Sequence, residues 1–500
     1  MARPARSAGS RCPLASSAGE RSGFTLIELL TATALTLLLM LAVVQIFATV
    51  SGSINDSRTT LEMNDRLRAT ANRLQRDLMG LTVTMVPPRR PQANEGYFEY
   101  VEGPMAGWAV RGGSLNCNLT ALGGDQNYPM TPVNYLETDS SGNPLRDMTV
   151  TDCDDILMFT TRDEAQPFTG KSTTGSVSSS VAEVAWFVRG RTLYRRSLII
   201  RPTLSVNQTL SGSFYLNYDL SARPNATHPG NVTLNSLGDL TNRENRFGHP
   251  AAAAGSFPFS TRGWKQLGLP ILWECRDHSP GQAPSSPSPL GNVDFWSPNP
   301  GLRPPTPWLG SSISDNQTMP TLPRANEDVI LTNVIGFDVK AWDPGAPLKS
   351  DSSGLGVALA PGDFTYSSAS NVVGYGAYVD LGYDPSLSDN PSSGCPAPCF
   401  HKVNYDAGSG GPRSGLYRTY DTWSTQYESD GIDQFGDGNT DQGTDGFDNN
   451  SDGRVDDASE QETQAPYPVP LRGIRVKIRT FDPESRQIRE TTVIQDFLVE

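Results

Sequence analysis

The longest apolar stretch of the chain decides its fold: residues 24–50 read FTLIELLTATALTLLLMLAVVQIFATV. These 27 residues contain one ionisable side chain, Glu28. As a helix they would extend roughly 40 Å, at about 1.5 Å per residue. The hydrocarbon core of a bilayer is about 30 Å thick. The stretch therefore predicts a helix that spans a membrane.

The charges on either side of this stretch predict its orientation. Residues 1–23 contain one acid, Glu20, and four basic residues, which are Arg3, Arg6, Arg11 and Arg21. A secretory signal peptide places its apolar run before the cleavage site, and here the order is reversed. Because positive charge stays on the cytoplasmic side of a span, residues 1–23 are expected in the cytoplasm and residues 51–500 outside it.

The residues around the start of the stretch carry a family signature. The sequence Arg21-Ser22-Gly23-Phe24-Thr25-Leu26-Ile27-Glu28-Leu29-Leu30 resembles the cleavage and methylation motif of type IV prepilins and type II secretion pseudopilins. The resemblance implies that a prepilin peptidase cuts between Gly23 and Phe24 and methylates the new amine of Phe24. Residues 1–23 would then be a leader peptide.

The same resemblance implies a role for Glu28, which would neutralise the N-terminal amine of a subunit during fibre assembly. Such pairing agrees with physical expectation, since a charge in a low-dielectric bundle needs a partner. Two features depart from the common pattern. The leader is long, and Gln45 stands where many major pilins have a helix-kinking proline. The second departure favours a straighter helix and a minor subunit.

An amphipathic stripe predicts that the helix continues beyond the membrane and covers residues 24–86. Apolar side chains recur at three- and four-residue steps at Met63, Leu67, Ala71, Leu74, Leu78 and Leu81. Charged residues, among them Arg73, Arg76 and Asp77, lie between them. We expect the stripe to pack under a sheet, and a groove for a partner helix is the alternative. Val86-Pro87-Pro88 predicts the end of the helix.

The remainder, residues 87–500, predicts an extracytoplasmic β-rich head. Expected strands are residues 155–161, 181–188, 192–200, 329–342, 372–381 and a C-terminal hairpin at 474–499. In the hairpin, Ile474, Val476 and Ile478 alternate with basic residues, which predicts one buried face. The fold class is therefore α+β: a long N-terminal membrane-spanning helix packed on an antiparallel sheet, with large loop insertions. This arrangement is similar to pilins, and the order of the strands is similar to PilW-type minor pilins.

A large insertion is predicted at residues 202–325, which are rich in Pro, Ser, Asn and Gly. Such a composition buries little apolar surface, so we expect an extended or partly disordered loop. Trp296 and Trp308 lie within it. Docking onto the head is the favoured interpretation of these side chains, and adhesion is the alternative.

An acidic segment, residues 428–462, holds twelve acids and one base, Arg454. It contains a tandem repeat, because Asp430 to Asp441 recurs fifteen residues later as Asp445 to Asp456. The second copy follows the pattern Asp-x-Asn-x-Asp-Gly, which supplies oxygen ligands at alternate positions for a hard cation. The predicted calcium ligands are Asp433, Asp437, Asp441, Asp445, Asp448, Asn450, Asp452 and Asp456.

The acidic segment departs from the helix-loop-helix calcium pattern, because Ser459 stands where a bidentate Glu is expected. Three interpretations remain: a loop held together by structural Ca²⁺, a solvated acidic tail, and a catalytic carboxylate cluster. Crowded carboxylates repel one another unless a cation neutralises them, so calcium is favoured. No histidine or lysine accompanies the acids within the segment, which disfavours catalysis.

Six cysteines agree with an oxidising compartment. Cys12 would leave with the leader. Of the other five, Cys117 and Cys153 form one possible disulfide, Cys395 and Cys399 another, and Cys275 would be left over. A zinc site at the second pair is the alternative, because His401 is close in sequence, but it would lack a second ligand pair.

The composition excludes several classes of function. A net charge of −14 argues against nucleic-acid binding, and four histidines leave little material for a multi-histidine metal enzyme. The motifs contain no nucleotide loop, nucleophile elbow or zinc-protease helix, so we predict no enzymatic activity.

The resemblance implies a structural subunit, a minor pilin of a type IV pilus or related fibre. Expected partners are prepilin peptidase, other pilins or pseudopilins through a bundle of N-terminal helices, and the inner-membrane assembly platform. The subunit would lie in the inner membrane before assembly and in a periplasmic or surface fibre afterwards. Alternatives are a type II secretion minor pseudopilin and a calcium-dependent surface adhesin on a pilin anchor.

Overall fold

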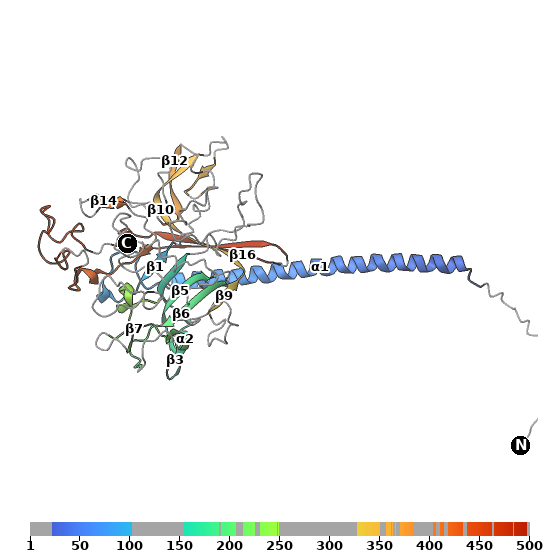
Figure 1. Cartoon of the computed structure of the whole chain (residues 1–500), viewed down its shortest axis with the longest axis horizontal. Coiled ribbons are helices and arrows are strands. Elements are labelled where there is room, and N and C mark those ends of the chain that lie inside the picture. The colour runs from blue at the N-terminus through green and yellow to red at the C-terminus, as the bar shows by residue number, and fades with distance from the viewer. Residues whose placement is uncertain are drawn as a thin grey trace, which may run out of the picture. The chain divides into compact units, whose positions relative to one another are not determined.

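The computed structural model describes residues 23–102, 155–189, 192–206, 214–225, 231–247, 249, 328–350, 357–361, 363, 366, 371–381, 383, 404–406, 411–414, 419–433, 438–462, 465–483 and 485–497 (Figure 1). The chain divides into two compact units, Met1–Leu61 and Glu62–Glu500. The class is α+β, with one long apolar N-terminal helix and several antiparallel sheets.

Helix α1 spans Leu26–Met79, a length of 54 residues, and continues without a break through Gln45. In its N-terminal part the large apolar side chains are exposed, for example Ile27, Leu38 and Phe47 at 65–71% of their full area. A helix of this length and composition is able to span a membrane.

The end of α1 differs from the prediction, because the helix stops at Met79 rather than at Val86. Beyond it the chain turns to run beside β2 (Ile156–Arg162). The backbone N–H of Thr82 donates to the carbonyl of Thr160 at 3.2 Å. Gly80 permits this approach, since a Cβ there would lie 2.3 Å from the carbonyl oxygen of Arg162. Pairing with the sheet therefore ends the helix before the prolines do.

The larger sheet has six strands in the order β15-β1-β2-β5-β6-β9, and each pair of neighbours is antiparallel. The strands are β15 (Thr419–Asp421), β1 (Phe98–Val101), β2, β5 (Val181–Arg189), β6 (Thr192–Ile199) and β9 (Val329–Thr332). The predicted strands at 155–161, 181–188 and 192–200 are thereby confirmed.

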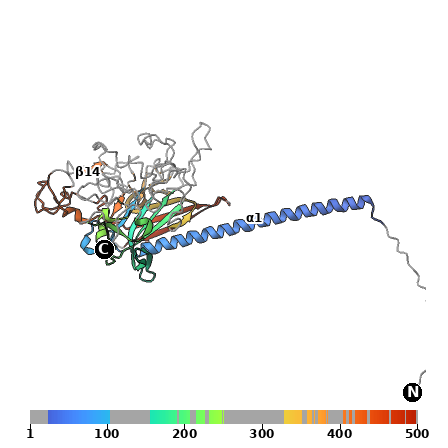
Figure 2. The same ribbon diagram turned by 60° about the horizontal axis from the view of Figure 1, so that its bottom comes forward.

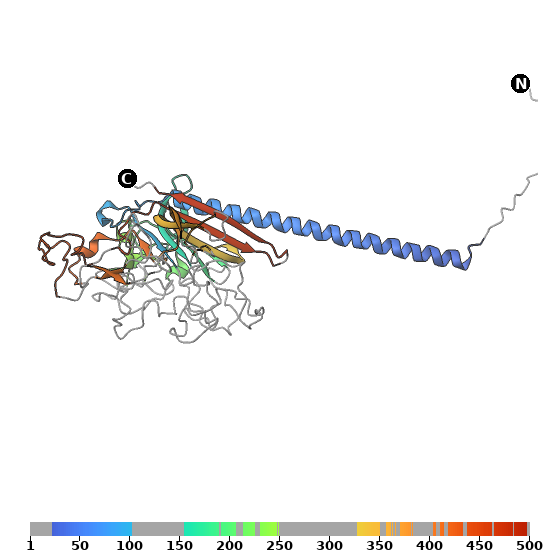
Figure 3. The ribbon, with the colours of Figure 1, turned by 90° about the horizontal axis from the view of Figure 1, so that it is seen from above.

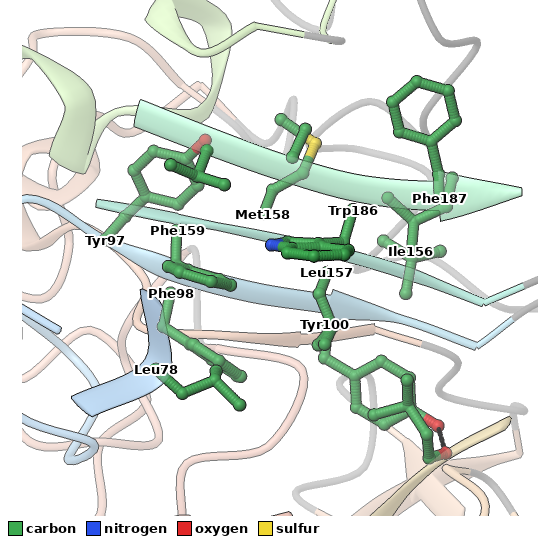
Figure 4. Packing of buried hydrophobic residues seen from close by; sticks show 14 of the residues in the cluster. Leu78, Tyr97, Phe98, Tyr100, Ile156, Leu157, Met158, Phe159, Trp186 and Phe187 are labelled. Carbon is green, nitrogen blue, oxygen red and sulfur yellow. Dashed lines mark hydrogen bonds between the residues drawn. The ribbon is translucent and has the colours of Figure 1, made fainter. Parts of the chain in front are cut away.

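The C-terminal part of α1 shares the hydrophobic core of this sheet. Leu67, Leu74 and Leu78 are at most 3% exposed, and Met63, Ala71 and Leu81 pack against the same core. Figure 4 shows Leu78 together with aromatic side chains of the sheet, including Phe98, Phe159 and Trp186. The predicted apolar stripe is confirmed. Burial of each of these leucine side chains stabilises the fold by about 1.5–3 kcal/mol.

The second sheet has the order β11-β10-β16-β17, and β12 also pairs with β10. Its strands are β10 (Val334–Ser350), β11 (Ala358–Leu359), β12 (Val372–Val379), β16 (Gly473–Phe481) and β17 (Ile488–Asp496). Figures 2 and 3 show the hairpin β16–β17, in red, beside β10. The predicted hairpin and its buried face are confirmed, because Ile474, Val476 and Ile478 have no exposed area.

One predicted strand proves to be two. Residues 329–342 divide into β9, which belongs to the larger sheet, and β10, which begins the second. The division falls at Asn333, whose φ of +58° turns the chain between the sheets. Asn333 tolerates the left-handed conformation and therefore interrupts the apolar pattern that predicted one continuous strand.

The smaller elements complete the head. Two-stranded sheets pair β3 (Phe168–Ser172) with β4 (Gly175–Ser179), β7 (Ala222–Pro224) with β8 (Val232–Leu234), and β13 (Asn404–Asp406) with β14 (Gly411–Ser414). Short helices are η1 (Pro91–Ala93), α2 (Phe214–Asn217), η3 (Asp239–Thr241), η4 (Arg243–Asn245) and η9 (Thr425–Glu428).

The prediction of an extended loop at 202–325 is wrong for its described first part. Residues 214–225 and 231–247 contain α2, β7, β8, η3 and η4, and side chains such as Leu240 and Phe247 are buried. Trp296 and Trp308 lie outside the described residues.

Candidate functional site

The predicted processing site lies at the start of α1. Gly23 and Phe24 precede the helix, and Phe24 is 86% exposed. Thr25 and Glu28 form a capping box: the backbone N–H and the hydroxyl of Thr25 donate to Glu28 Oε2 at 2.9 and 2.8 Å. In return, the backbone N–H of Glu28 donates to Thr25 Oγ1 at 3.3 Å. The Gly23–Phe24 peptide bond is thus non-helical and adjoins a defined helix start.

The two copies of the acidic repeat share hydrogen bonds at equivalent described positions. The N–H of Gly431 donates to Asp441 in the first copy, and in the second Gly446 donates to Asp456 at 2.9 Å. The N–H of Gly438 donates to Asp433 Oδ2 at 2.7 Å. Likewise, the N–H of Gly453 donates to Asp448 Oδ2 at 2.8 Å. The fifteen-residue sequence repeat is therefore also a repeat of hydrogen bonds.

Left-handed backbone positions recur with the same spacing. Gly438 and Gly453 have φ of +95° and +90°, and Asp441 and Asp456 have φ of +54° and +53°. Glycine adopts this region without cost, and aspartate is among the few other residues that visit it. These positions let each copy turn sharply, so that its carboxylates face its own backbone N–H groups.

Buried glutamates form hydrogen bonds within the acidic segment, a role that no sequence pattern predicted. Glu428 and Glu462 are at most 5% exposed, and the N–H of Glu462 donates to Glu428 Oε2 at 3.1 Å. Glu460 is 2% exposed and accepts from the N–H groups of Asn449, Asn450 and Asp457. Three of the twelve acids thus hold the segment together.

The predicted site residues are only partly brought together. Among the described residues, no three His, Cys, Asp or Glu side chains converge as a metal-binding group. Asp437 lies outside the described residues, as do Cys117, Cys153, Cys275, Cys395, Cys399 and His401. Calcium binding and the two disulfides remain predictions.

A buried ion pair joins α1 to the larger sheet. Arg195 on β6 donates through Nε and Nη2 to the two carboxylate oxygens of Asp77 at 2.6 and 2.8 Å. The indole N–H of Trp186 on β5 donates to Asp77 Oδ2 at 3.0 Å. Sequence periodicity placed Asp77 among the polar residues of the helix, but it is 3% exposed.

A second buried network lies between β1, β15 and the segment 243–249. Glu99 and Asp421 occupy opposite positions on the paired strands, and both are fully buried. Arg246 Nη1 contacts Glu99 at 3.0 Å and Asp421 at 2.7 Å, and Arg243 contacts the same two carboxylates. The arginines thus offset two like charges that would otherwise repel each other across the strands.

His249 completes this network, since its Nε2 lies 2.9 Å from Glu99 Oε2. Burial would raise the pKa of Glu99, but Arg243, His249 and Arg246 hold that pKa well below its usual range. Burial lowers the pKa of His249 to about 4, although Glu99 opposes the shift. At neutral pH the network therefore holds an ionised Glu99 against a neutral imidazole.

Both buried networks are suited to stabilising the fold rather than to binding a ligand. Their carboxylates are occupied by arginine, indole or imidazole donors and are removed from solvent. Comparison of the chain with known protein families, with curated proteins and with solved structures finds no match.

Proposed function

We propose that the chain is a structural subunit, a minor pilin, of a type IV pilus or a related fibre. In this proposal prepilin peptidase removes residues 1–23, and the subunit assembles through the N-terminal part of α1 in contact with other pilins and the assembly platform. The supporting observation is the motif from Gly23 to Glu28 at the start of an apolar 54-residue helix.

The difference in exposure between the two parts of α1 supports the proposal. The apolar side chains of its N-terminal part are exposed, which in water is unfavourable and suits a bilayer or a helix bundle. The side chains of its C-terminal part, such as Leu74, are buried against the sheet. One helix thus supplies both an anchor and a core element.

The experiment is intact-mass and N-terminal analysis of the protein extracted from membranes of a host with an active prepilin peptidase. A chain that begins at methylated Phe24 supports the proposal, and a chain that retains residues 1–23 contradicts it. Gly23→Ala should block processing. Gly52→Ala is a matched control, because neither position has any atom within 4 Å of an added Cβ.

Structural calcium belongs to the same proposal. The repeated geometry of residues 430–441 and 445–456 supports it, since two loops of one design present several carboxylates within a short span. A type II secretion minor pseudopilin has the same processing motif and is the alternative within the class. A calcium-dependent adhesin is the alternative from another class, and binding of a glycan or protein ligand that requires Ca²⁺ would favour it.

A further inference from the structure

A lysine lies among carboxylates where the second sheet meets the larger one. Lys340 on β10 contacts Asp380, the residue that follows β12, and its Nζ lies 3.5 Å from Asp338 Oδ1. The pairing of Ala341 with Val379 places Lys340 and Asp380 next to each other on neighbouring strands. The side chains of Lys340 and Asp380 are 12% and 4% exposed.

The choice of lysine at this position is unusual for this chain, which has 34 arginines and six lysines. Where other buried carboxylates of the described residues form ion pairs, the partner is often arginine, as for Asp77 with Arg195 and Asp219 with Arg196. Arginine suits a buried ion pair better, because its guanidinium is less strongly hydrated. Lysine differs in one chemical respect, since its amine becomes a nucleophile once it loses a proton.

A third carboxyl group, Glu102, is placed beside both residues. Its Oε2 accepts from the backbone N–H of Leu381, the neighbour of Asp380, at 3.0 Å. It also accepts from the hydroxyl of Tyr100, which in turn contacts the carbonyl of Val339, the neighbour of Lys340. Glu102 is 2% exposed, and its Oε1 is buried without a hydrogen-bond partner among the described residues.

We propose that Lys340 and Asp380 become joined by an intramolecular amide bond, with Glu102 as the proton carrier. The Lys340 ammonium gives up a proton, and its nitrogen forms a bond with Cγ of Asp380. The bond from Cγ to one carboxylate oxygen then breaks, and that oxygen leaves as water with two protons from the former ammonium, one of them passed on by Glu102. The reaction is a dehydration and consumes no other reactant.

Burial and the neighbouring charges set where the protons of the cluster are held. Burial and the nearby Asp380 raise the pKa of Glu102 well above its usual range, so that Glu102 is able to hold a proton. Burial also raises the pKa of Asp380, although Lys340 opposes the shift. Burial would lower the pKa of Lys340, but Asp338 and Asp380 raise it, so Lys340 needs a nearby carboxyl group that accepts its proton. The amide removes two charges from a dry site, where an ion pair carries a large desolvation cost.

The first experiment is mass spectrometry of the reduced full-length protein, purified in detergent. A bond lowers the intact mass by one water, about 18 Da. Trypsin should then leave residues 325–349 uncut at Lys340 and linked to residues 350–402. Release of separate peptides 325–340, 341–349 and 350–402 would overturn the proposal. This readout uses the unaltered protein, so it does not depend on the folding of any variant.

Variants then assign the roles. Lys340→Arg and Asp380→Ala should each abolish the loss of water, and Glu102→Gln should abolish or strongly slow it while both reacting residues remain. Lys349→Arg is the matched control, because Lys349 is a second buried lysine of β10 that lies over the Tyr366 ring. It should retain the bond. A Glu102→Gln protein that is fully cross-linked would contradict the role of Glu102 as proton carrier.

Discussion

Asp77 on α1 and Arg195 on β6 form a bidentate ion pair that is almost completely buried, with N–O distances of 2.6 and 2.8 Å. The hydroxyl of Thr161 donates to the carbonyl of the same Asp77 at 2.7 Å. The last two turns of the helix are thus attached to β2, β5 and β6 by polar contacts as well as by leucines. This attachment fixes both the depth and the rotation of the helix on the sheet.

Asp77→Ala should strongly destabilise the head, because it leaves the guanidinium of Arg195 buried without its partner. We expect a loss of about 3–5 kcal/mol in the free energy of unfolding, measured by urea denaturation of the detergent-solubilised protein. Asp65→Ala, at an exposed position of the same helix, should change it by at most about 0.5 kcal/mol. Equal losses of stability in the two variants would contradict a stabilising role for the ion pair between Asp77 and Arg195.

Glu28→Ala should leave cleavage after Gly23 intact and lower incorporation into fibres, because the subunit loses the charge proposed to pair with an amine. Thr25→Ala separates this role from helix capping, since it removes the capping hydroxyl and keeps the carboxylate. Loss of that cap costs about 1 kcal/mol. Quantitative immunoblots of sheared fibres measure incorporation. Equal defects in both variants would assign Glu28 to capping alone.

Calcium should raise the melting temperature of the protein if the acidic repeat binds it. Asp448→Ala and Asp452→Ala should abolish the rise. Asp457→Ala provides the control, because Asp457 lies in the same segment outside the predicted ligands and accepts from Ser459. Differential scanning calorimetry with calcium and with chelator is the measurement. If Ca²⁺ still raised the melting temperature of Asp448→Ala and Asp452→Ala, the ion would bind outside the predicted ligands.

His249 should make the head sensitive to acid. Its pKa is about 4 in the fold and about 6.5 when unfolded, so the unfolded chain binds the proton first. Stability is therefore complete above about pH 6.5 and declines as the pH falls toward 4, by on the order of 3 kcal/mol in total. His249→Gln keeps an N–H donor for Glu99 and cannot titrate. Urea titrations at several pH values should show a smaller acid loss in this variant.

Patterns of apolar residues predicted much of the fold. The stripe from Met63 to Leu81 packs as expected, and β2, β5, β6, β12, β16 and β17 lie at predicted residues, whereas β1, β11 and β15 were not predicted. These features depend on periodicity, which a single sequence displays directly. The processing motif likewise depends on adjacent residues, so its position could be predicted without knowledge of any tertiary contact.

The polar contacts could not be predicted in the same way. In the sequence Asp77 has the pattern of a surface residue, because its partner Arg195 is distant along the chain. The segment 239–249 has a loop-like composition, and it folds because Arg243 and Arg246 reach Glu99 and Asp421. Burial of a charge depends on partners from other segments, and no local pattern records them.

The acidic repeat allows one unit to be removed with the same residues left on either side. Asp430, Asp445 and Glu460 occupy successive equivalent positions at fifteen-residue intervals. Deletion of 446–460 would leave Asp445 in the place of Glu460, followed by the same Gln461 and by Glu462, whose N–H binds Glu428. Removal of one unit would therefore keep the same residues at both ends of the segment, including Glu428 and Glu462 with the hydrogen bond between them. The repeat thus permits the acidic segment to differ in length by fifteen residues at a time.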